Sequence, residues 1–370
     1  MKIDSTYPTE KVFEQENVAF LDVREEPFQI YGLYEPKKGD EFIRLPIEVA
    51  KNTNEGVLEN AYHTAGGRVR FATDSPFLAV RAKIKKMTRF PHMPRTGTSG
   101  FDLYEHGMNG RDYYVLTFTP MEDEPGWGKA IHSDYVEQEH IWVSLRPTKT
   151  DGKLHYYTIH FPLYNDLVSL EIGVEAGCEV LPGADYAPIP PVVYYGSSIT
   201  QGGCASRPGN AYQNIISARN NIDHINLGFS GSARGEEIMA EYIAGLKMSV
   251  LVMDYDANAP SPEHLEKTHE RFFQIIREKN PELPVIFVTI PRAPVNEMFI
   301  RRRSIIYNTF RRAFDSGDRN VSFLDGYSLF DAEYYDVCTV DGVHPNDAGF
   351  VGMAKVIGNE LSRVLNHRVW

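Results

Sequence analysis

The stretch PVVYYGSSITQGG, residues 191–203, contains the pattern that decides the fold of the second half of the chain. Its four apolar residues VVYY indicate a short buried strand, and the glycines and serines after them indicate a turn. Small residues let a backbone turn sharply from strand to helix. The stretch therefore predicts a strand whose end presents the hydroxyl of Ser198 in the open, with Ser197 as a supporting neighbour.

Short apolar runs recur after this stretch and alternate with longer amphipathic segments. The segment 261–280 begins with a serine suited to an N-cap and a proline suited to a first turn, and it places Leu265, Phe272 and Ile276 on one face. Alternating strands and helices are typical of a parallel sheet covered by helices on both sides. We therefore predict a three-layer α/β domain. Its remaining strands are expected in HINLGFSG, SVLVMDYD, PVIFVTIP and VSFLDG.

The first half of the chain has a different period. Apolar and polar residues alternate in LAVRAKIK (78–85), YYTIHF (156–161) and VSLEIGVE (168–175), and turn residues separate such runs. Alternation with one polar face indicates half-buried antiparallel strands, and no long helical pattern is evident before about residue 185. These features predict an antiparallel β-sandwich of jelly-roll type.

A proline-rich segment, LPGADYAPIPP at 181–191, separates the two patterns. Prolines cannot donate backbone hydrogen bonds, and they hold a chain extended. At 370 residues the chain is long enough for two cores. We predict a β-sandwich domain over residues 1–185 and an α/β domain over residues 186–370.

The charge and hydropathy of the chain argue against two classes of partner. With 38 basic and 50 acidic residues the formal net charge is -12, which disfavours nucleic acid because phosphate binding needs a basic face. No window reaches the roughly 18 apolar residues of a membrane span, and the amino terminus does not resemble a signal peptide. We expect no membrane partner and a cytoplasmic location.

The cysteines and a group of arginines have ordinary structural explanations. Cys178, Cys204 and Cys338 are odd in number and widely spaced, so neither a disulfide framework nor a zinc site is indicated, and Cys204 is expected to be a buried structural thiol. The five arginines between residues 301 and 312 are expected on a solvated helix face.

The ends of the predicted parallel strands carry the residues that could perform catalysis. Ligands bind outside the carboxyl ends of such strands, and there the sequence places Ser198, Gly231, Asn258, Asp341 and His344. A serine, a base, an acid and hydrogen-bond donors are what acyl transfer from an ester requires. Each residue has an ordinary alternative role as a cap or turn residue. Their joint occurrence at successive strand ends favours a catalytic site.

Other motifs are excluded by particular residues. GSSITQGG lacks the lysine of a phosphate-binding loop, and Thr200 stands where the nucleophile elbow G-x-S-x-G needs its last glycine. DYDANAP begins like a calcium loop, but Ala259 replaces the required glycine and Leu265 the closing glutamate.

The same residues resemble a known family, the GDSL or SGNH hydrolases. Four sequence blocks occur in the order that this family has: GSSITQG (196–202), NLGFSG (226–231), DYDANA (254–259) and DGVHP (341–345). The sequence departs from the family at Ser197, where the family has an acid, and it lacks the glycine before Asn258. A β-sandwich ahead of such a half is similar to a bacterial branch with carbohydrate-directed and other acyl esterases.

The strand-end residues and the resemblance together imply a serine esterase. Ser198 would be the nucleophile, His344 the base and Asp341 the residue that orients it, while the oxyanion would be bound by Ser198 N–H, Gly231 N–H and the Asn258 amide. The expected reaction is release of a short acyl group, acetyl first, from a carbohydrate or other polar alcohol. The alternatives are an acyltransferase that uses the same acyl-enzyme and a non-catalytic glycan-binding protein.

The first half of the chain offers a candidate substrate loop. The stretch RFPHMPRTGTSGFDLY, residues 89–104, is rich in turn residues and contains His92 and Arg95 as candidate substrate-binding side chains; its alternative is an ordinary surface loop. The expected partner is a small-molecule or glycan ester, and no cofactor or metal is expected. The sequence does not indicate an oligomeric state.

Overall fold

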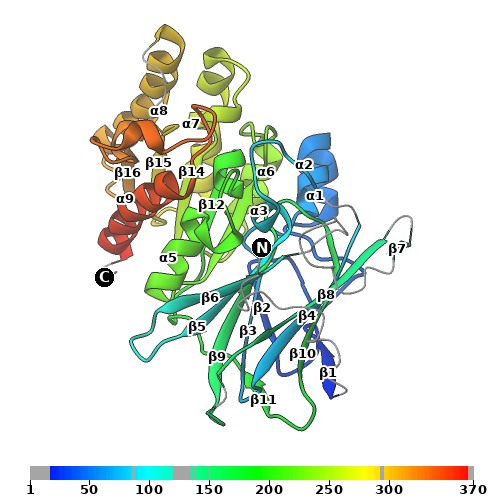
Figure 1. Cartoon of the computed structure of the whole chain (residues 1–370). Coiled ribbons are helices and arrows are strands. Elements are labelled where there is room, and N and C mark those ends of the chain that lie inside the picture. Colours follow the sequence, from blue (N-terminus) through cyan, green and yellow to red (C-terminus); the bar gives the residue numbers. More distant parts are fainter. Residues whose placement is uncertain are drawn as a thin grey trace.

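The computed structural model describes residues 17–85, 88–119, 135–136, 139–149, 151–291 and 296–365. Antiparallel strands form the lower part of the molecule in Figure 1, and a parallel sheet with its helices forms the upper part. No helix within the described ranges is long and apolar enough to span a membrane.

The first half of the chain builds two antiparallel sheets. One has the order β1-β10-β4-β8-β7. Its strands are β1 (Val18–Asp22), β10 (Leu167–Glu175), β4 (Phe77–Ile84), β8 (Glu139–Pro147) and β7 (Tyr135–Val136). The other has the order β11-β3-β9-β5-β6, with β2 paired to β3. Its strands are β11 (Val180–Pro182), β3 (Arg68–Thr73), β9 (His155–His160), β5 (Phe101–His106), β6 (Asp112–Phe118) and β2 (Gln29–Tyr31).

A shared hydrophobic core holds these two sheets face to face. Val80 and Ile172 from the first sheet pack with Phe71 and Ile159 from the second, and all four side chains are fully buried. Burial of apolar side chains between two inner faces is the main stabilising term of a sandwich. The prediction of an antiparallel β-sandwich is confirmed.

The polar face of the second sheet differs from its prediction. Sequence alternation implied a half-buried sheet, but Arg68 and Arg70 of β3 and Thr158 of β9 are buried on this face. Arg68 forms an ion pair with Asp223 and donates to the backbone carbonyl of His224 at 3.2 Å. This face is covered by the second half of the chain, and the guanidinium groups bind its polar atoms there.

The second half contains a five-stranded parallel sheet of order β13-β12-β14-β15-β16. The strands are β12 (Val192–Gly196), β13 (His224–Gly228), β14 (Val250–Asp254), β15 (Val285–Val288) and β16 (Val321–Leu324). Each lies in an apolar run that the sequence analysis selected. From β12 the chain order runs outward in both directions, and α/β sheets with such a reversal bind ligands at the carboxyl ends of the central strands.

Helices cover both faces of the parallel sheet. In β12, Val192 and Tyr194 belong to the core on one face and Val193 and Tyr195 to the core on the other, which explains the unbroken apolar run. The helices on the first face are α5 (Tyr212–Asn220) and α9 (Asp347–Leu365), and those on the second are α6 (Glu237–Ala244), α7 (Pro262–Lys279) and α8 (Glu297–Asp315). The three-layer prediction is confirmed.

Helix α7 begins as the sequence predicts. The hydroxyl of Ser261 accepts a hydrogen bond from the backbone N–H of His264 at 3.3 Å, and Pro262 is the first helical residue. The face that carries Leu265, Phe272 and Ile276 is buried.

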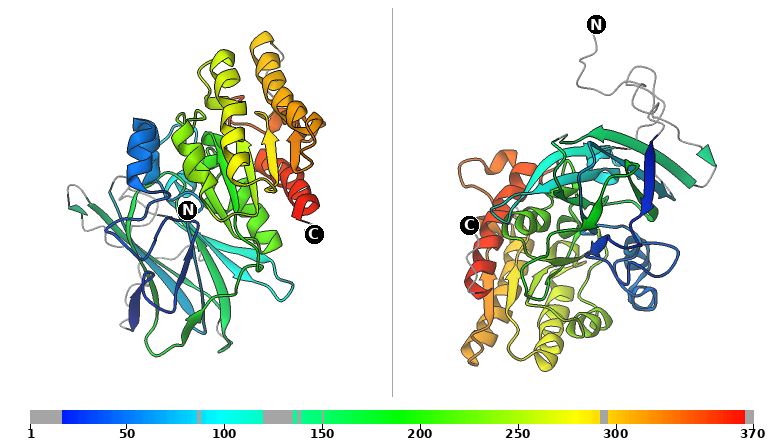
Figure 2. Two further views of the ribbon diagram at one scale, coloured as in Figure 1. Left: turned by 180° about the vertical axis from the view of Figure 1, so that it is seen from behind. Right: turned by 90° about the horizontal axis from the view of Figure 1, so that it is seen from below.

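Two short helices of the first half join the core of the second. They are α1 (Ile47–Thr53) and α2 (Glu55–Ala61), and Figures 1 and 2 show them beside α6. Their buried residues Ala50 and Val57 belong to the same hydrophobic cluster as Met239 of α6. The side-chain amide of Asn54 donates to the carbonyl of Ser232 at 3.0 Å. The sequence analysis did not predict these helices. The domain boundary between residues 185 and 186 stays a prediction.

Candidate active site

The nucleophile candidate lies at the start of a one-turn helix, α4 (Ser198–Gln201), directly after β12. Ser197 is its N-cap, fully buried, and its hydroxyl accepts from the backbone N–H of Ile199 at 3.2 Å. Gly196 is required by space, because a Cβ there would lie 2.3 Å from the carbonyl oxygen of Asp254. Ser198 is partly exposed. The turn therefore presents its hydroxyl as the sequence analysis expects.

The acid and base candidates lie together in the loop between β16 and α9. His344 Nδ1 is 2.7 Å from Asp341 Oδ2, and the backbone N–H of His344 donates to Asp341 Oδ1 at 2.7 Å. Burial alone would raise the pKa of Asp341, but hydrogen bonds from the backbone and ring of His344 and from Val343 N–H lower it to about 2. Asp341 is therefore a carboxylate at neutral pH.

A second hydrogen bond joins this pair to the serine. Ser198 Oγ lies 2.9 Å from His344 Nε2. Because Nδ1 of the same ring faces Asp341, the geometry fits a tautomer with its proton on Nδ1 and a lone pair on Nε2 toward the hydroxyl. The structure thus brings together Ser198, His344 and Asp341. Ser198 and His344 are 146 residues apart in sequence, and His344 and Asp341 are 3 apart.

The oxyanion candidates follow the two strands that flank β12. Gly231 lies in the exposed turn after β13, with φ of +67°. Asn258 ends the 3₁₀ turn η3 (Asp256–Asn258) after β14, and its amide donates to the carbonyl of Phe229 at 2.9 Å. This bond ties the Asn258 side chain to the turn that carries Gly231. Ser198, Gly231 and Asn258 thus follow three adjacent parallel strands, β12, β13 and β14.

The turn that carries Asn258 is held by Arg302 of α8. Its guanidinium donates to the carbonyl oxygens of Asp256 and Ala259, the second at 2.7 Å. Arg302 is buried, so the expectation of a fully solvated arginine face is wrong at this position. The other arginines of the group are exposed and pair with acidic side chains: Arg301, Arg303, Arg311 and Arg312.

Gln201 connects α4 to the oxyanion turn and to the first half of the chain. Its side-chain oxygen accepts from the backbone N–H of Ser230 at 2.9 Å. Its side-chain nitrogen lies 3.1 Å from both His63 Nδ1 and the carbonyl oxygen of Leu163. Gln201 is fully buried. Sequence reasoning missed this role, because only the fold brings these segments together.

The candidate substrate stretch of the first half reaches His344, the candidate base. The rings of His92 and His344 have centroids 5.8 Å apart, and the ring of Phe90 packs against His92. The stretch is less loop-like than expected, because it contains helix α3 (Arg95–Ser99) and the start of β5. Arg95 is the first residue of α3 and is partly exposed. His92 therefore lies next to the ring of the candidate base, His344.

A buried network docks the first half onto the segment after α4. The Asp102 carboxylate accepts from Arg207 Nη1 at 2.9 Å and from the Gly209 backbone N–H at 2.7 Å, and the Tyr104 hydroxyl accepts from Arg207 at 2.7 Å. Asp102 is fully buried. A buried carboxylate with three polar partners, including the Thr117 hydroxyl, is well satisfied. The sequence analysis did not single out these residues.

Cys204 lies beside the triad and is buried, as expected, but its backbone is unusual. Its φ is +75°, a left-handed conformation that residues other than glycine rarely adopt. Burial and the nearby carboxylate of Asp341 raise the pKa of the thiol to about 12, so it is protonated at neutral pH. Among the described residues, the side chains of His92, Cys204 and His344 form a group with metal-ligating potential.

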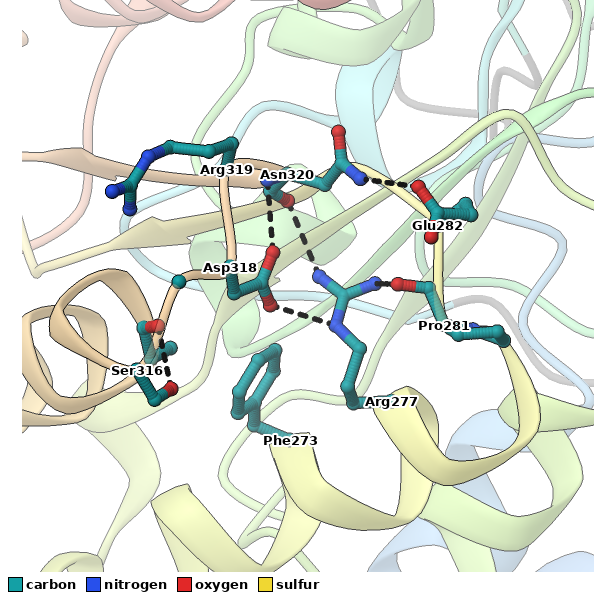
Figure 3. A pocket seen from close by; sticks show the side chains of 10 residues that line it. Phe273, Arg277, Pro281, Glu282, Ser316, Asp318, Arg319 and Asn320 are labelled. Carbon is teal, nitrogen blue, oxygen red and sulfur yellow. Dashed lines mark hydrogen bonds and ion pairs between the residues drawn. The ribbon is translucent and has the colours of Figure 1, made fainter.

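Two cavities differ in their relation to these residues. A cavity of about 410 Å³ opens beside the triad and is lined by His92, Cys204, Ser206 and Asp347 among others. Another, of about 380 Å³, lies between the ends of α7 and α8, before β15 and β16 begin (Figure 3). There Arg277 already donates to backbone carbonyls and pairs with Asp318 at 2.9 Å. Of these two cavities, the one lined by His92 and Cys204 lies next to His344.

Comparison with known protein families assigns a model to each half of the chain. Residues 190–362 match the model of the GDSL-like lipase/acylhydrolase family, and residues 18–180 match GxDLY, the N-terminus of the Esterase_SGNH_hydro-type. The GxDLY motif corresponds here to residues 100–104, which include Asp102 and Tyr104 of the docking network. No curated protein sequence matches the chain significantly.

Solved structures resemble the whole described architecture. A protein of Bacteroides ovatus assigned as a GDSL-like lipase is 25% identical with a TM-score of 0.82, covering 95% of this chain and 99% of its own. The salicylyl-acyltransferase SsfX3 of a tetracycline biosynthetic pathway is 18% identical with a TM-score of 0.74, over 95% and 99%. The acetyl xylan esterase Est2A of Butyrivibrio proteoclasticus is 13% identical with a TM-score of 0.58, over 95% and 99%. The last two establish the shared fold.

Proposed function

The chain belongs to the GDSL-like lipase/acylhydrolase family and is an ester-bond hydrolase, and on that premise we propose that Ser198, His344 and Asp341 are its catalytic triad. The observation that carries the proposal is a continuous chain of hydrogen bonds. Ser198 Oγ is 2.9 Å from His344 Nε2, and His344 Nδ1 is 2.7 Å from Asp341 Oδ2. This is the arrangement that activates a serine hydroxyl.

In the first half-reaction, Ser198 Oγ attacks the carbonyl carbon of the ester while its proton moves to His344 Nε2. Asp341 remains a carboxylate throughout, because its pKa is lowered to about 2, and it stabilises the imidazolium that forms. His344 then gives the proton to the leaving alcohol oxygen, which leaves an acyl-Ser198. Water attacks this acyl-enzyme by the same route in reverse and releases the acid.

The negative charge of the tetrahedral intermediate would be stabilised by three donors. Ser198 is the first residue of α4, where backbone N–H groups have no partner within the helix. Gly231 would offer its backbone N–H from the neighbouring turn. The Asn258 amide has two N–H donors and uses one on the carbonyl of Phe229, which leaves the other for the oxyanion.

The proposed substrate is a short-chain ester, acetyl first, of a carbohydrate or another polar alcohol. The cavity beside His344 has a mainly apolar lining that also includes the polar side chains of Ser206, Asn346, Asp347 and His92. A few polar groups in an apolar lining can orient a polar alcohol next to a short acyl group. The acetyl xylan esterase and family two carbohydrate esterases share the fold, which agrees with this class. His92 is proposed to contact the substrate, with Arg95 as a second candidate.

The test compares hydrolysis of p-nitrophenyl acetate, butyrate and octanoate by wild type and Ser198→Ala. Removal of a nucleophile is expected to lower turnover by at least roughly a thousandfold. Ser197→Ala is the matched control, because Ser197 is the adjacent serine and serves as an N-cap. Equal activity of wild type and Ser198→Ala would refute the assignment. For the oxyanion, Asn258→Ala is expected to lower turnover by about a hundred- to a thousandfold, and a loss within about threefold would contradict its role.

Acyl transfer is the second candidate function, because the salicylyl-acyltransferase shares both halves of the architecture. The same acyl-Ser198 would then react with an alcohol instead of water. Product analysis with an added sugar or alcohol acceptor separates the two reactions. A non-catalytic glycan-binding role predicts that a serine-reactive fluorophosphonate does not label the protein, whereas both catalytic functions predict labelling of Ser198.

A further inference from the structure

Three metal-ligating side chains from distant parts of the chain meet at the active site. The ligand atoms of His92, Cys204 and His344 all lie within 4.8 Å of one another. His92 comes from the first half of the chain, Cys204 from the segment after α4, and His344 from the loop before α9. No sequence motif predicts such a group, because the three residues lack the spacing of a known metal-binding motif.

The donor set has the chemistry of a zinc site. Two imidazoles and one sulfur favour a borderline-soft cation such as Zn²⁺ over Mg²⁺ or Ca²⁺, which prefer oxygen. Tetrahedral zinc with bonds of about 2.0–2.3 Å separates its ligand atoms by about 3.3–3.6 Å. The spacing of up to 4.8 Å here is somewhat wider, so rotations of the exposed His92 side chain bring the donors into range.

His344 already has the outer contact that histidine ligands use. Metal-bound histidines almost always donate their second ring N–H to a carboxylate or carbonyl, which fixes the tautomer and directs the other nitrogen to the metal. His344 Nδ1 lies 2.7 Å from Asp341 Oδ2, so Nε2 is the nitrogen that remains for a ligand bond. The same nitrogen lies 2.9 Å from Ser198 Oγ.

The other two donors are held beside it. Cys204 is buried, and its backbone is left-handed with φ of +75°. The preceding residue, Gly203, lies against the His344 ring, since a Cβ added to Gly203 would be 3.5 Å from it. The rings of His92 and His344 have centroids 5.8 Å apart and are tilted by 38°, and Phe90 packs against His92. His92 and Cys204 both line the cavity of about 410 Å³.

We propose that His92, Cys204 and His344 form a Zn²⁺ site that reversibly inhibits the enzyme. Zn²⁺ would bind through imidazole nitrogens of the two histidines and the sulfur of Cys204, whose thiol proton passes to solvent, and water would complete the tetrahedron. With Nε2 bound to the metal, His344 cannot take the proton of Ser198. The inhibition rests on the proposed function, whereas the binding of the metal does not.

Two measurements test the binding and the inhibition separately. Binding is measured on the whole protein by titration with Zn²⁺ in a calorimeter and by absorption after titration with Co²⁺, which gives a thiolate-to-cobalt charge-transfer band only if a sulfur is bound. Inhibition is measured as the ratio of p-nitrophenyl acetate hydrolysis with and without Zn²⁺, followed by EDTA. Because each protein is compared with itself, changes in basal activity do not affect this ratio.

The variants are Cys204→Ser, His92→Ala and the matched thiol control Cys178→Ser, which lies at the turn between β10 and β11. We expect wild type and Cys178→Ser to be inhibited and to recover with EDTA. Cys204→Ser and His92→Ala should need at least about tenfold more Zn²⁺. The charge-transfer band should disappear in Cys204→Ser and persist in Cys178→Ser.

The proposal is overturned if Zn²⁺ does not bind, if the cobalt band survives in Cys204→Ser, if inhibition is the same in all variants, or if Zn²⁺ raises activity. If the protein proves inactive on every ester, the titrations and the cobalt spectra still decide the metal site. Failure of the proposed function is thereby distinguished from failure of this inference.

Discussion

The guanidinium of Arg302 donates a hydrogen bond to the carbonyl oxygen of Ala259 at 2.7 Å, and it also binds the carbonyl of Asp256. The two carbonyls bracket Asn258, the proposed side-chain donor to the oxyanion. Arg302 is buried in α8 and is far from the triad in sequence. If Asn258 binds the oxyanion as proposed, Arg302 is a positioning residue, because it holds the turn that carries Asn258.

Arg302→Met is expected to lower kcat by about ten- to a hundredfold with a smaller change in KM, because misplacement of a transition-state donor affects the transition state more than the ground state. Arg301→Met is the matched control, since Arg301 is exposed and pairs with Glu263 and Glu266 at the surface. Steady-state kinetics with p-nitrophenyl acetate measure both parameters. Equal losses of kcat in the two variants would contradict the positioning role.

Gly196→Ala should disrupt the nucleophile turn. A Cβ at this position would lie 2.1 Å from Thr200 Oγ1 and 2.3 Å from the carbonyl of Asp254, so the backbone has to move. A displacement of about 1 Å at a nucleophile lowers rates by about a hundredfold. Gly245→Ala, where the nearest atom would be 3.3 Å away, is the comparison. Turnover together with the thermal midpoint of each variant checks the prediction, and an active Gly196→Ala enzyme would refute it.

The docking network predicts a stability effect. Asp102→Asn leaves the guanidinium of Arg207 without its carboxylate in a site where Asp102 is fully buried. Removal of one partner of a buried pair destabilises by about 3 kcal/mol, the low end of the usual range, because Arg207 remains 21% exposed. Urea unfolding measures the free energy. Glu48→Gln, in which Glu48 and its partner Lys51 are both exposed, should leave the free energy of unfolding close to that of wild type.

The buried ring of His160 predicts a pH dependence of stability. Burial, and to a lesser degree the nearby Arg68 guanidinium, lower the pKa of His160 from 6.5 to about 3. The unfolded chain takes up a proton below about pH 6.5 while the native chain does not until about pH 3, so stability present at neutral pH is lost as pH falls between these values.

The titration of His160 alone is expected to lower the free energy of unfolding by about 1.2 kcal/mol between about pH 7 and pH 5.5. Urea unfolding at the two values measures it. His160→Phe should reduce the difference by that amount, whereas the half-buried control His264→Phe should not. An unchanged difference in His160→Phe would contradict the prediction.

Strand ends carried most of the information about the candidate site. The apolar run before Ser198 and the runs before Gly231 and Asn258 have local patterns, and parallel strands place their carboxyl ends side by side. The residues proposed as the triad could therefore be selected before the fold was known, and their catalytic roles stay a prediction. Asp341 and His344 could also be recognised from the sequence because they are only three residues apart, and the structure joins them by a hydrogen bond.

Residues that act across the fold could not be selected in this way. Arg302 looks like any exposed arginine of an amphipathic helix, and its burial depends on a turn 43 residues away in sequence. The arginines of β3 occupy the positions of a solvent-facing sheet, and only the second half of the chain buries them. Periodicity reports which residues share a face, but not what covers that face.

The helices α1 and α2 also set the order of events when the protein is made. Asn54, between them, bonds Glu236, which is 182 residues later in the chain. A ribosome adds about 5–20 residues each second, so these helices leave it roughly ten seconds or more before their packing surface exists. Until then their apolar faces are exposed. The first half is therefore not an autonomous unit that completes its fold as it emerges, and the nascent chain depends on its own later part to cover them.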